Sequence, residues 1–178
     1  MLRLRTATIA DAHLLATLGA RLFEQTFGPA NTAEDMATYL AEAFSPARQA
    51  AELAEANRVT WIAEDSSGTA VGYAVLIRNA AVESVTANQP AELRRIYADL
   101  SRPPGNDEPT SPKLGALLMN RCLDQAREWG CDVIWLAVWE MNARAIRFYE
   151  KNGFQKVGVK TFQLGTDLQH DFVMARNL

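Results

Sequence analysis

The residues best suited to chemistry gather in the segment 142–154, where polar and aromatic side chains recur at helical spacing. If this segment is a helix, one of its faces carries Asn142, Ala145, Ile146 and Tyr149. The cations of the same segment then point elsewhere, namely Arg144, Arg147 and Lys151. The face pairs a hydrogen-bonding amide with a phenol, a group able to donate a proton. The alternative is a core tyrosine whose hydroxyl bonds to a carbonyl.

The segment 142–154 resembles the one that follows the fifth strand in the GNAT superfamily of N-acetyltransferases. The resemblance implies that the face with Asn142 and Tyr149 lies against the thioester of acetyl-coenzyme A (acetyl-CoA). Such a transferase binds a thioester, removes a proton from an ammonium and returns a proton to the departing thiolate. The resemblance assigns the last step to Tyr149 as general acid.

The segment from Glu92 to Asp99 resembles the fourth strand of the family, whose backbone pairs with the pantetheine arm of the cofactor. It implies cofactor contacts at Ile96, Tyr97 and Ala98. Some family members hold their general base at the position of Glu92, where a carboxylate can take the amine proton directly or through water. A solvated acid at the start of a strand is an equally open interpretation of Glu92.

The phosphate-binding loop departs from the family pattern. Where the family has Gln/Arg-x-x-Gly-x-Gly/Ala, this chain has Thr110 to Leu114, and Gly115 alone remains of the motif glycines. A helix beginning at Ser111-Pro112 still offers free N–H groups and the positive end of its dipole to a pyrophosphate. The expected contacts are Ser111, Lys113, Leu114, Gly115 and Ala116. Because side chains replace backbone donors, acetyl-CoA should bind less tightly than with an intact loop.

The family's acceptor pocket is lined by the first two helices and the last hairpin. In this chain that implies a pocket with Phe23, Glu24, Phe27, Glu34, Asp35 and Tyr39. The closing segment 162–174 resembles the terminal hairpin of a bacterial branch that includes polyamine acetyltransferases. His170 lies in it, although a lone histidine near a hairpin is more often a surface residue.

The helices and strands that position these residues are predicted from hydrophobic periodicity and capping signals. Strands are predicted over 2–7, 58–64, 70–78, 92–99 and 131–139, with a last hairpin around 164–167. Helices are predicted after the capping signals at Thr8, Thr32, Ser45 and Ser111, and over 142–151. The order indicates an α/β layered domain with a mixed, largely antiparallel sheet of about seven strands and helices on both faces. The crossover between 92–99 and 131–139 predicts that these two strands are parallel.

The composition limits the classes of protein to which this chain can belong. A chain of 178 residues with 48% hydrophobic residues fits one domain, here 1–178. The net charge of -3 argues against nucleic acid as a partner. The start of the chain has no leader pattern and no run is apolar enough to span a membrane, so we expect a cytoplasmic protein. Cys122 and Cys131 have no metal-site spacing and are expected to be buried thiols, with no metal bound.

The sequence therefore predicts an N-acetyltransferase that acetylates a primary amine of a small molecule or peptide by direct attack, with acetyl-CoA as cosubstrate. The altered phosphate loop keeps open a non-catalytic acyl-CoA binding module. A nucleotide-binding domain is disfavoured, because neither Gly-x-Gly-x-x-Gly nor Gly-x-x-x-x-Gly-Lys-Ser/Thr occurs. The acceptor amine and the oligomeric state, including a homodimer, stay open.

Overall fold

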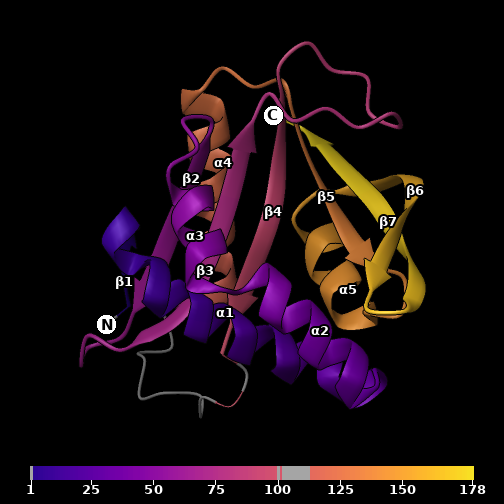
Figure 1. The fold of residues 1–178 in the computed structure, drawn as a ribbon. Coiled ribbons are helices and arrows are strands. Elements are labelled where there is room, and N and C mark those ends of the chain that lie inside the picture. The colour runs from indigo at the N-terminus through magenta and orange to yellow at the C-terminus, as the bar shows by residue number, and fades with distance from the viewer. Residues whose placement is uncertain (1, 100, 102–112) are drawn as a thin grey trace.

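One mixed sheet organises the part of the chain that the computed structural model describes, which is residues 2–99, 101 and 113–178. Its strand order is β1-β2-β3-β4-β5-β7-β6 (Figure 1). Only β4 and β5 are parallel neighbours, and the other pairs are antiparallel. The strands are β1 Arg3–Thr6, β2 Arg58–Glu64, β3 Ala70–Arg78, β4 Pro90–Ala98, β5 Val133–Trp139, β6 Gln155–Leu164 and β7 Asp167–Asn177. The predicted sheet and its one parallel pair are confirmed.

Three of the helices begin at a residue whose side chain caps them. Thr32 accepts a hydrogen bond from the Asp35 backbone, and Ser45 accepts one from the Arg48 backbone. The helices are α1 Ala12–Phe27, α2 Ala33–Ala43, α3 Pro46–Leu53, α4 Leu114–Glu128 and α5 Ala143–Lys151, with short 3-10 turns at Ile9–Asp11 and Gly28–Ala30. Because each cap satisfies a backbone N–H that would otherwise lack a partner, these starts were readable from sequence.

Helix α4 begins later than predicted. The expected start was Ser111-Pro112, which lies outside the described residues, but the first helical residue is Leu114. Lys113 precedes it with φ −60° and ψ 142°, an extended conformation that cannot continue a helix. The free N–H groups at this helix end therefore belong to Leu114, Gly115 and Ala116.

Helices cover both faces of the sheet, as predicted, because alternate residues of the central strands point to opposite sides. Ile62 and Tyr73 pack with Leu15 and Leu18 of α1 on one face. On the other face a larger cluster joins the sheet to α4 and α5, and it contains Trp61, Ala63, Ala74, Leu76, Leu118, Met119, Cys122, Ile134, Leu136 and Tyr149. Cys122 and Cys131 are buried free thiols, as expected.

Strands β4 and β5 separate after a short stretch of pairing. Their register runs only from Pro90 opposite Val133 to Glu92 opposite Trp135, and beyond it the strands diverge (Figure 1). Just past this point Arg94 is an extra residue in β4, since Val75 pairs with Arg95 while Leu76 pairs with Leu93. A bulge bends a strand and increases its twist. The second half of β4 is thus paired with β3 on one side alone.

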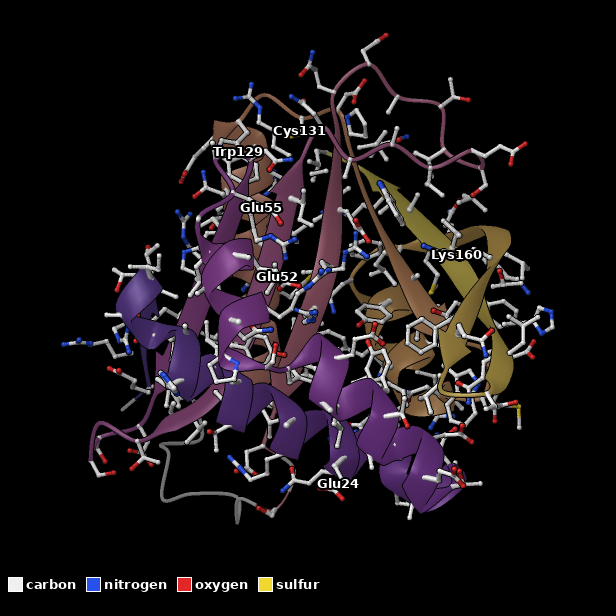
Figure 2. All side chains as sticks on the ribbon, viewed as in Figure 1. Glu24, Glu52, Glu55, Trp129, Cys131 and Lys160 are labelled. Atoms are coloured by element: carbon white, nitrogen blue, oxygen red, sulfur yellow. The ribbon has the colours of Figure 1, made fainter. Side chains whose placement is uncertain are left out.

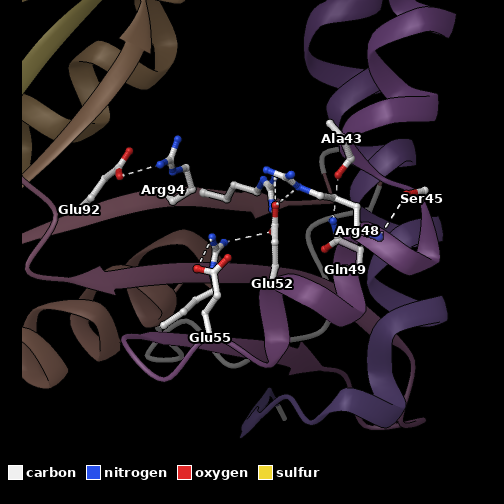
Figure 3. A network of polar contacts seen from close by, with 10 residues as sticks. Ala43, Ser45, Arg48, Gln49, Glu52, Glu55, Glu92 and Arg94 are labelled. Atoms are coloured by element: carbon white, nitrogen blue, oxygen red, sulfur yellow. Dashed lines mark hydrogen bonds and ion pairs between the residues drawn. The ribbon is translucent and has the colours of Figure 1, made fainter.

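A buried ion-pair network anchors this half of β4 to α3 and β2 (Figure 3). The Glu52 carboxylate accepts hydrogen bonds from Arg95 at 2.6 Å, from Arg48 at 3.0 Å and from Arg58 at 3.1 Å. The side chains of Glu52, Arg58 and Arg95 are only 7%, 8% and 11% exposed. Burial raises the pKa of Glu52, but hydrogen bonding and the charges of the arginines outweigh it and hold that pKa below its usual range.

Replacing Glu52 should therefore destabilise the fold. In Glu52→Gln the buried guanidinium of Arg95 loses its counter-charge and that of Arg58 keeps only Glu55, so we expect the free energy of unfolding to fall by about 1–3 kcal/mol. The matched control is Glu55→Gln, which also removes a partner of Arg58 but from a side chain that is 44% exposed, so its loss should stay below about 1 kcal/mol. Urea unfolding at pH 7 compares the variants, and equal losses would contradict this account of the network.

The sign of the pH dependence provides a further check on the same variant. A carboxylate whose pKa is lowered by folding contributes stability above its unfolded pKa, which is about 4.3 for glutamate. That contribution is lost as the pH falls through the folded pKa. The stability difference between the parent and Glu52→Gln should shrink below about pH 4.

Candidate active site

A cavity of about 790 Å³ occupies the gap between the diverging strands. Its lining includes Tyr97 of β4 and Val138 of β5, and it draws on helices from both faces of the sheet. Phe23 and Tyr39 come from α1 and α2 on one face, and Tyr149 comes from α5 on the other. The cavity therefore passes through the sheet, and two ligands entering from opposite faces can meet inside it.

Most of the predicted cofactor contacts line this cavity. They are Ile96, Tyr97, Ala98, Lys113, Gly115, Ala116, Asn142 and Tyr149. Leu114 instead packs its side chain against the core, although its backbone N–H lies in the first turn of α4. Ser111 lies outside the described residues. The fold thus brings together residues that are up to 53 positions apart in the sequence, from Ile96 to Tyr149.

Tyr149 lies in a setting that suits a proton donor. It is 9% exposed, with its ring centroid 5.5 Å from that of Phe148 and 6.0 Å from that of Phe154. Burial raises the pKa of its phenol, and the nearby Cys122 thiol acts in the same direction, so the hydroxyl stays protonated. Among the described residues the hydroxyl has no hydrogen-bond partner. The alternative interpretation, a core tyrosine bonded to a carbonyl, lacks that bond.

Glu92 is buried, so the interpretation as a solvated acid is wrong. It is 4% exposed and forms an ion pair of 3.1 Å with Arg94. Burial raises the pKa of its carboxyl, while Arg94 and Lys160 oppose that change. Its neighbours Ala91 and Leu93 belong to the core on the α4 face, so strand alternation places Glu92 on the opposite face from Tyr149.

The start of helix α5 places the cation of Arg144 at the cavity, although the sequence pattern predicted that this side chain points elsewhere. Arg144 lines the cavity, because the first turn of α5 stands at its edge, whereas Arg147 and Lys151 are absent from the lining as predicted. Asn142 also lines it, but its side-chain oxygen caps the helix by accepting a hydrogen bond of 3.1 Å from the Ala145 backbone. The α4 side of the cavity therefore carries Lys113 and Arg144 as basic side chains.

On the opposite face, half of the predicted acceptor residues line the cavity. Phe23, Phe27 and Tyr39 do, whereas Glu24, Glu34 and Asp35 do not. Glu24 lies on the outer side of α1, as Figure 2 shows. The Asp35 carboxylate instead accepts hydrogen bonds from the backbone and hydroxyl of Thr166, at 2.6 and 3.0 Å, and so ties α2 to the turn of the last hairpin.

A buried acid in the same hairpin, Asp171, was not predicted from the sequence. Side chains alternate along β7, so Gln169 and Asp171 line the cavity while His170 between them does not. The His170 side chain is 54% exposed and lies 4.0 Å from Glu140, which agrees with its expected surface position. The alternation of side chains along β7 could have identified Asp171 from the sequence only if the covered face of this strand had been known.

No group of three or more potential metal ligands occurs among the described residues. Within the same residues, no helix is long and apolar enough to cross a membrane.

The sequence comparisons all indicate the same protein family. A model of the acetyltransferase (GNAT) family matches residues 108–154. An uncharacterized N-acetyltransferase from Mycobacterium tuberculosis is 35% identical over 170 residues, which cover 96% of this chain and 99% of that protein. Another, from Lactobacillus delbrueckii subsp. lactis, is 32% identical over 157 residues, covering 88% of this chain and 86% of that protein.

Solved structures share the architecture. A PaiA N-acetyltransferase from Thermoplasma acidophilum, in complex with coenzyme A, has a TM-score of 0.73 at 20% identity, covering 100% of this chain and 99% of that chain. A GCN5-related N-acetyltransferase from Rhodopseudomonas palustris has a TM-score of 0.72 at 18% identity, with 99% and 95% covered. These two likenesses concern the fold, and the family follows from the closer sequence relationships. This chain belongs to the GNAT family of acetyl-CoA-dependent N-acetyltransferases.

Proposed function

We propose that this chain transfers the acetyl group of acetyl-CoA to a primary amine of a small molecule or peptide by direct attack. The observation that supports this most is the cavity through the sheet, with a buried phenol, Tyr149, on one face and a buried carboxylate, Glu92, on the other. Acyl transfer to an amine uses one group that accepts a proton from the attacking ammonium and one that gives a proton to the departing thiolate.

The cofactor side of the cavity suits acetyl-CoA. The backbone of Ile96 to Ala98 has no strand partner on the β5 side, so the amides of a pantetheine arm can pair with it as an added strand. The first turn of α4 presents free N–H groups and a positive dipole end to the pyrophosphate. Lys113 and Arg144 add cations in place of the family's glycine loop.

The chemistry divides between the two buried groups. Glu92 takes a proton from the acceptor ammonium, which frees the nitrogen lone pair to attack the thioester carbonyl carbon. Its raised pKa makes it a stronger base than an exposed carboxylate, and the charge of Arg94 opposes that rise. As the carbon–sulfur bond breaks, Tyr149 gives its phenolic proton to the sulfur, and the nitrogen loses its second proton, which restores the phenol through solvent. The products are an N-acetylated amine and free coenzyme A thiol.

Removing the hydroxyl of Tyr149 tests this assignment. In Tyr149→Phe the ring is kept, so the melting temperature and the KM for acetyl-CoA should hardly change, while kcat should fall by about 10²-fold. The deficit should shrink above about pH 8.5, where a thiolate leaves readily without a proton. The measurement is thiol release from acetyl-CoA over a panel of amines, with mass spectrometry of the products.

Tyr73→Phe is the matched control. Tyr73 is also a buried tyrosine whose hydroxyl lacks a hydrogen-bond partner, but it is absent from the cavity lining. This control should keep the parental kcat. Full kcat in Tyr149→Phe between pH 6 and 9 would contradict the general-acid role.

Lys113 tests the proposed pyrophosphate contact. We expect Lys113→Ala to weaken acetyl-CoA binding about 3- to 10-fold at low ionic strength, and less at high salt because an exposed charge is screened. Titration calorimetry at two salt concentrations measures this. Lys151→Ala, outside this cavity, should bind acetyl-CoA like the parent. Parental affinity in Lys113→Ala would make Lys113 only a solvated residue beside the helix.

A further inference from the structure

One buried acid in the cavity has no partner. Asp171 of β7 is 9% exposed and lines the cavity, yet among the described residues its carboxylate makes no hydrogen bond and no ion pair. The other two buried acids of the lining are paired, Glu52 with three arginines and Glu92 with Arg94. A buried carboxylate without a partner is unfavourable, so a site of this kind is built for a ligand that supplies the missing charge.

The charges around Asp171 leave it available. Lys160 stands opposite on β6 and Glu140 follows β5, while Tyr39 faces it from α2 and Glu92 from β4. Lys160, labelled in Figure 2, does not reach an ion pair with Asp171 and lies 5.8 Å from the Trp135 ring. Burial raises the pKa of Asp171 to about 6, with Lys160 lowering it and Glu140 raising it. At pH 7 the carboxylate is mostly ionised.

Aromatic rings form the walls beside this carboxylate. The acceptor rings, as we name them, all line the cavity, and they are Phe23, Phe27, Tyr39, Trp139 and Phe162. Ring centroids are 4.7 Å apart for Phe23 and Tyr39, 5.4 Å for Tyr39 and Phe162, and 6.1 Å for Phe27 and Trp139. Trp139 and Asp171 are direct cross-strand partners, so their side chains share one face of the sheet.

We propose that the acceptor is an arylalkylamine with a single ammonium group, whose flat apolar body packs among the acceptor rings while Asp171 holds the ammonium. The proposal rests on the proposed function and names its substrate class. Aromatic walls favour a flat apolar body and also attract a cation at a ring face. One unpaired buried acid matches one ammonium.

A polyamine fits this arrangement poorly. Its further cations would need further free acids, but Glu52 and Glu92 are paired with arginines and Lys160 stands opposite Asp171. The remaining acid, Glu42, is exposed. In this arrangement Asp171 orients the nitrogen and Glu92 takes its proton, so Asp171 is a positioning residue.

The experiment measures binding and turnover separately, with 2-phenylethylamine, hexylamine and spermidine as probes. In the parent at saturating acetyl-CoA, 2-phenylethylamine should have the lowest KM. In Asp171→Asn its KM should rise about 10- to 100-fold, because a hydrogen bond to a charged group is lost, while the KM for acetyl-CoA stays unchanged. The melting temperature should stay equal or rise, since a buried unpaired charge is removed.

Two further readouts separate a specific role from a structural one. The parental KM for 2-phenylethylamine should rise as the pH falls below about 6, where Asp171 takes up a proton, and Asp171→Asn should lack this rise. Glu34→Gln is the control, an exposed acid on α2 outside the cavity, and should behave like the parent. Calorimetry with coenzyme A bound gives the amine affinity without turnover.

The outcomes are distinguishable. Equal affinity of the parent and Asp171→Asn for 2-phenylethylamine, or tighter binding of spermidine than of 2-phenylethylamine, would overturn the proposal and leave the acetyltransferase function standing. Amine binding that depends on Asp171, without acetyl transfer to any probe, would support the binding site and overturn the proposed function.

Discussion

The site depends on the loss of pairing between β4 and β5 after Glu92 and Trp135. A parallel pair that continued would fill the middle of the sheet with hydrogen bonds and leave no passage between its faces. The bulge at Arg94 turns β4 away, and Glu52 holds Arg95 from the far side. The backbone freed in this way is a row of polar groups that a ligand can satisfy, since buried N–H and C=O groups rarely stay unpaired.

The separation of β4 and β5 also leaves Tyr149 and the two buried acids on different faces of the sheet. Tyr149 belongs to the core on the α4 and α5 face, whereas Glu92 and Asp171 lie on the face of α1 and α2. The α4 side combines a helix start with basic side chains, and the opposite side combines aromatic rings with acids. Burial then keeps the phenol protonated and raises the pKa of both carboxyls.

Local signals in the sequence predicted most of the fold. The capping signals at Thr32 and Ser45 marked two helix starts, and strand alternation gave the sheet its members. Features set by distant parts of the chain were missed. Lys113 is extended rather than helical, Asp35 is bound to Thr166, and Asp171 lies in the cavity because β7 pairs with β5. The candidate residues Asn142 and Tyr149 on α5 were predicted from a helical face of fixed spacing and from the family resemblance. No such pattern identifies a candidate on a strand whose covered face is unknown.

Amide hydrogen–deuterium exchange with and without acetyl-CoA tests the central claim, that the gap between β4 and β5 receives the cosubstrate. Residues 95–98 of β4 have a strand partner on the β3 side alone, so the amides that point into the gap should exchange quickly in the free protein. On addition of acetyl-CoA, exchange should slow in these residues and in the first turn of α4. Unchanged exchange in both segments, at a ligand concentration that saturates the protein, would contradict the account.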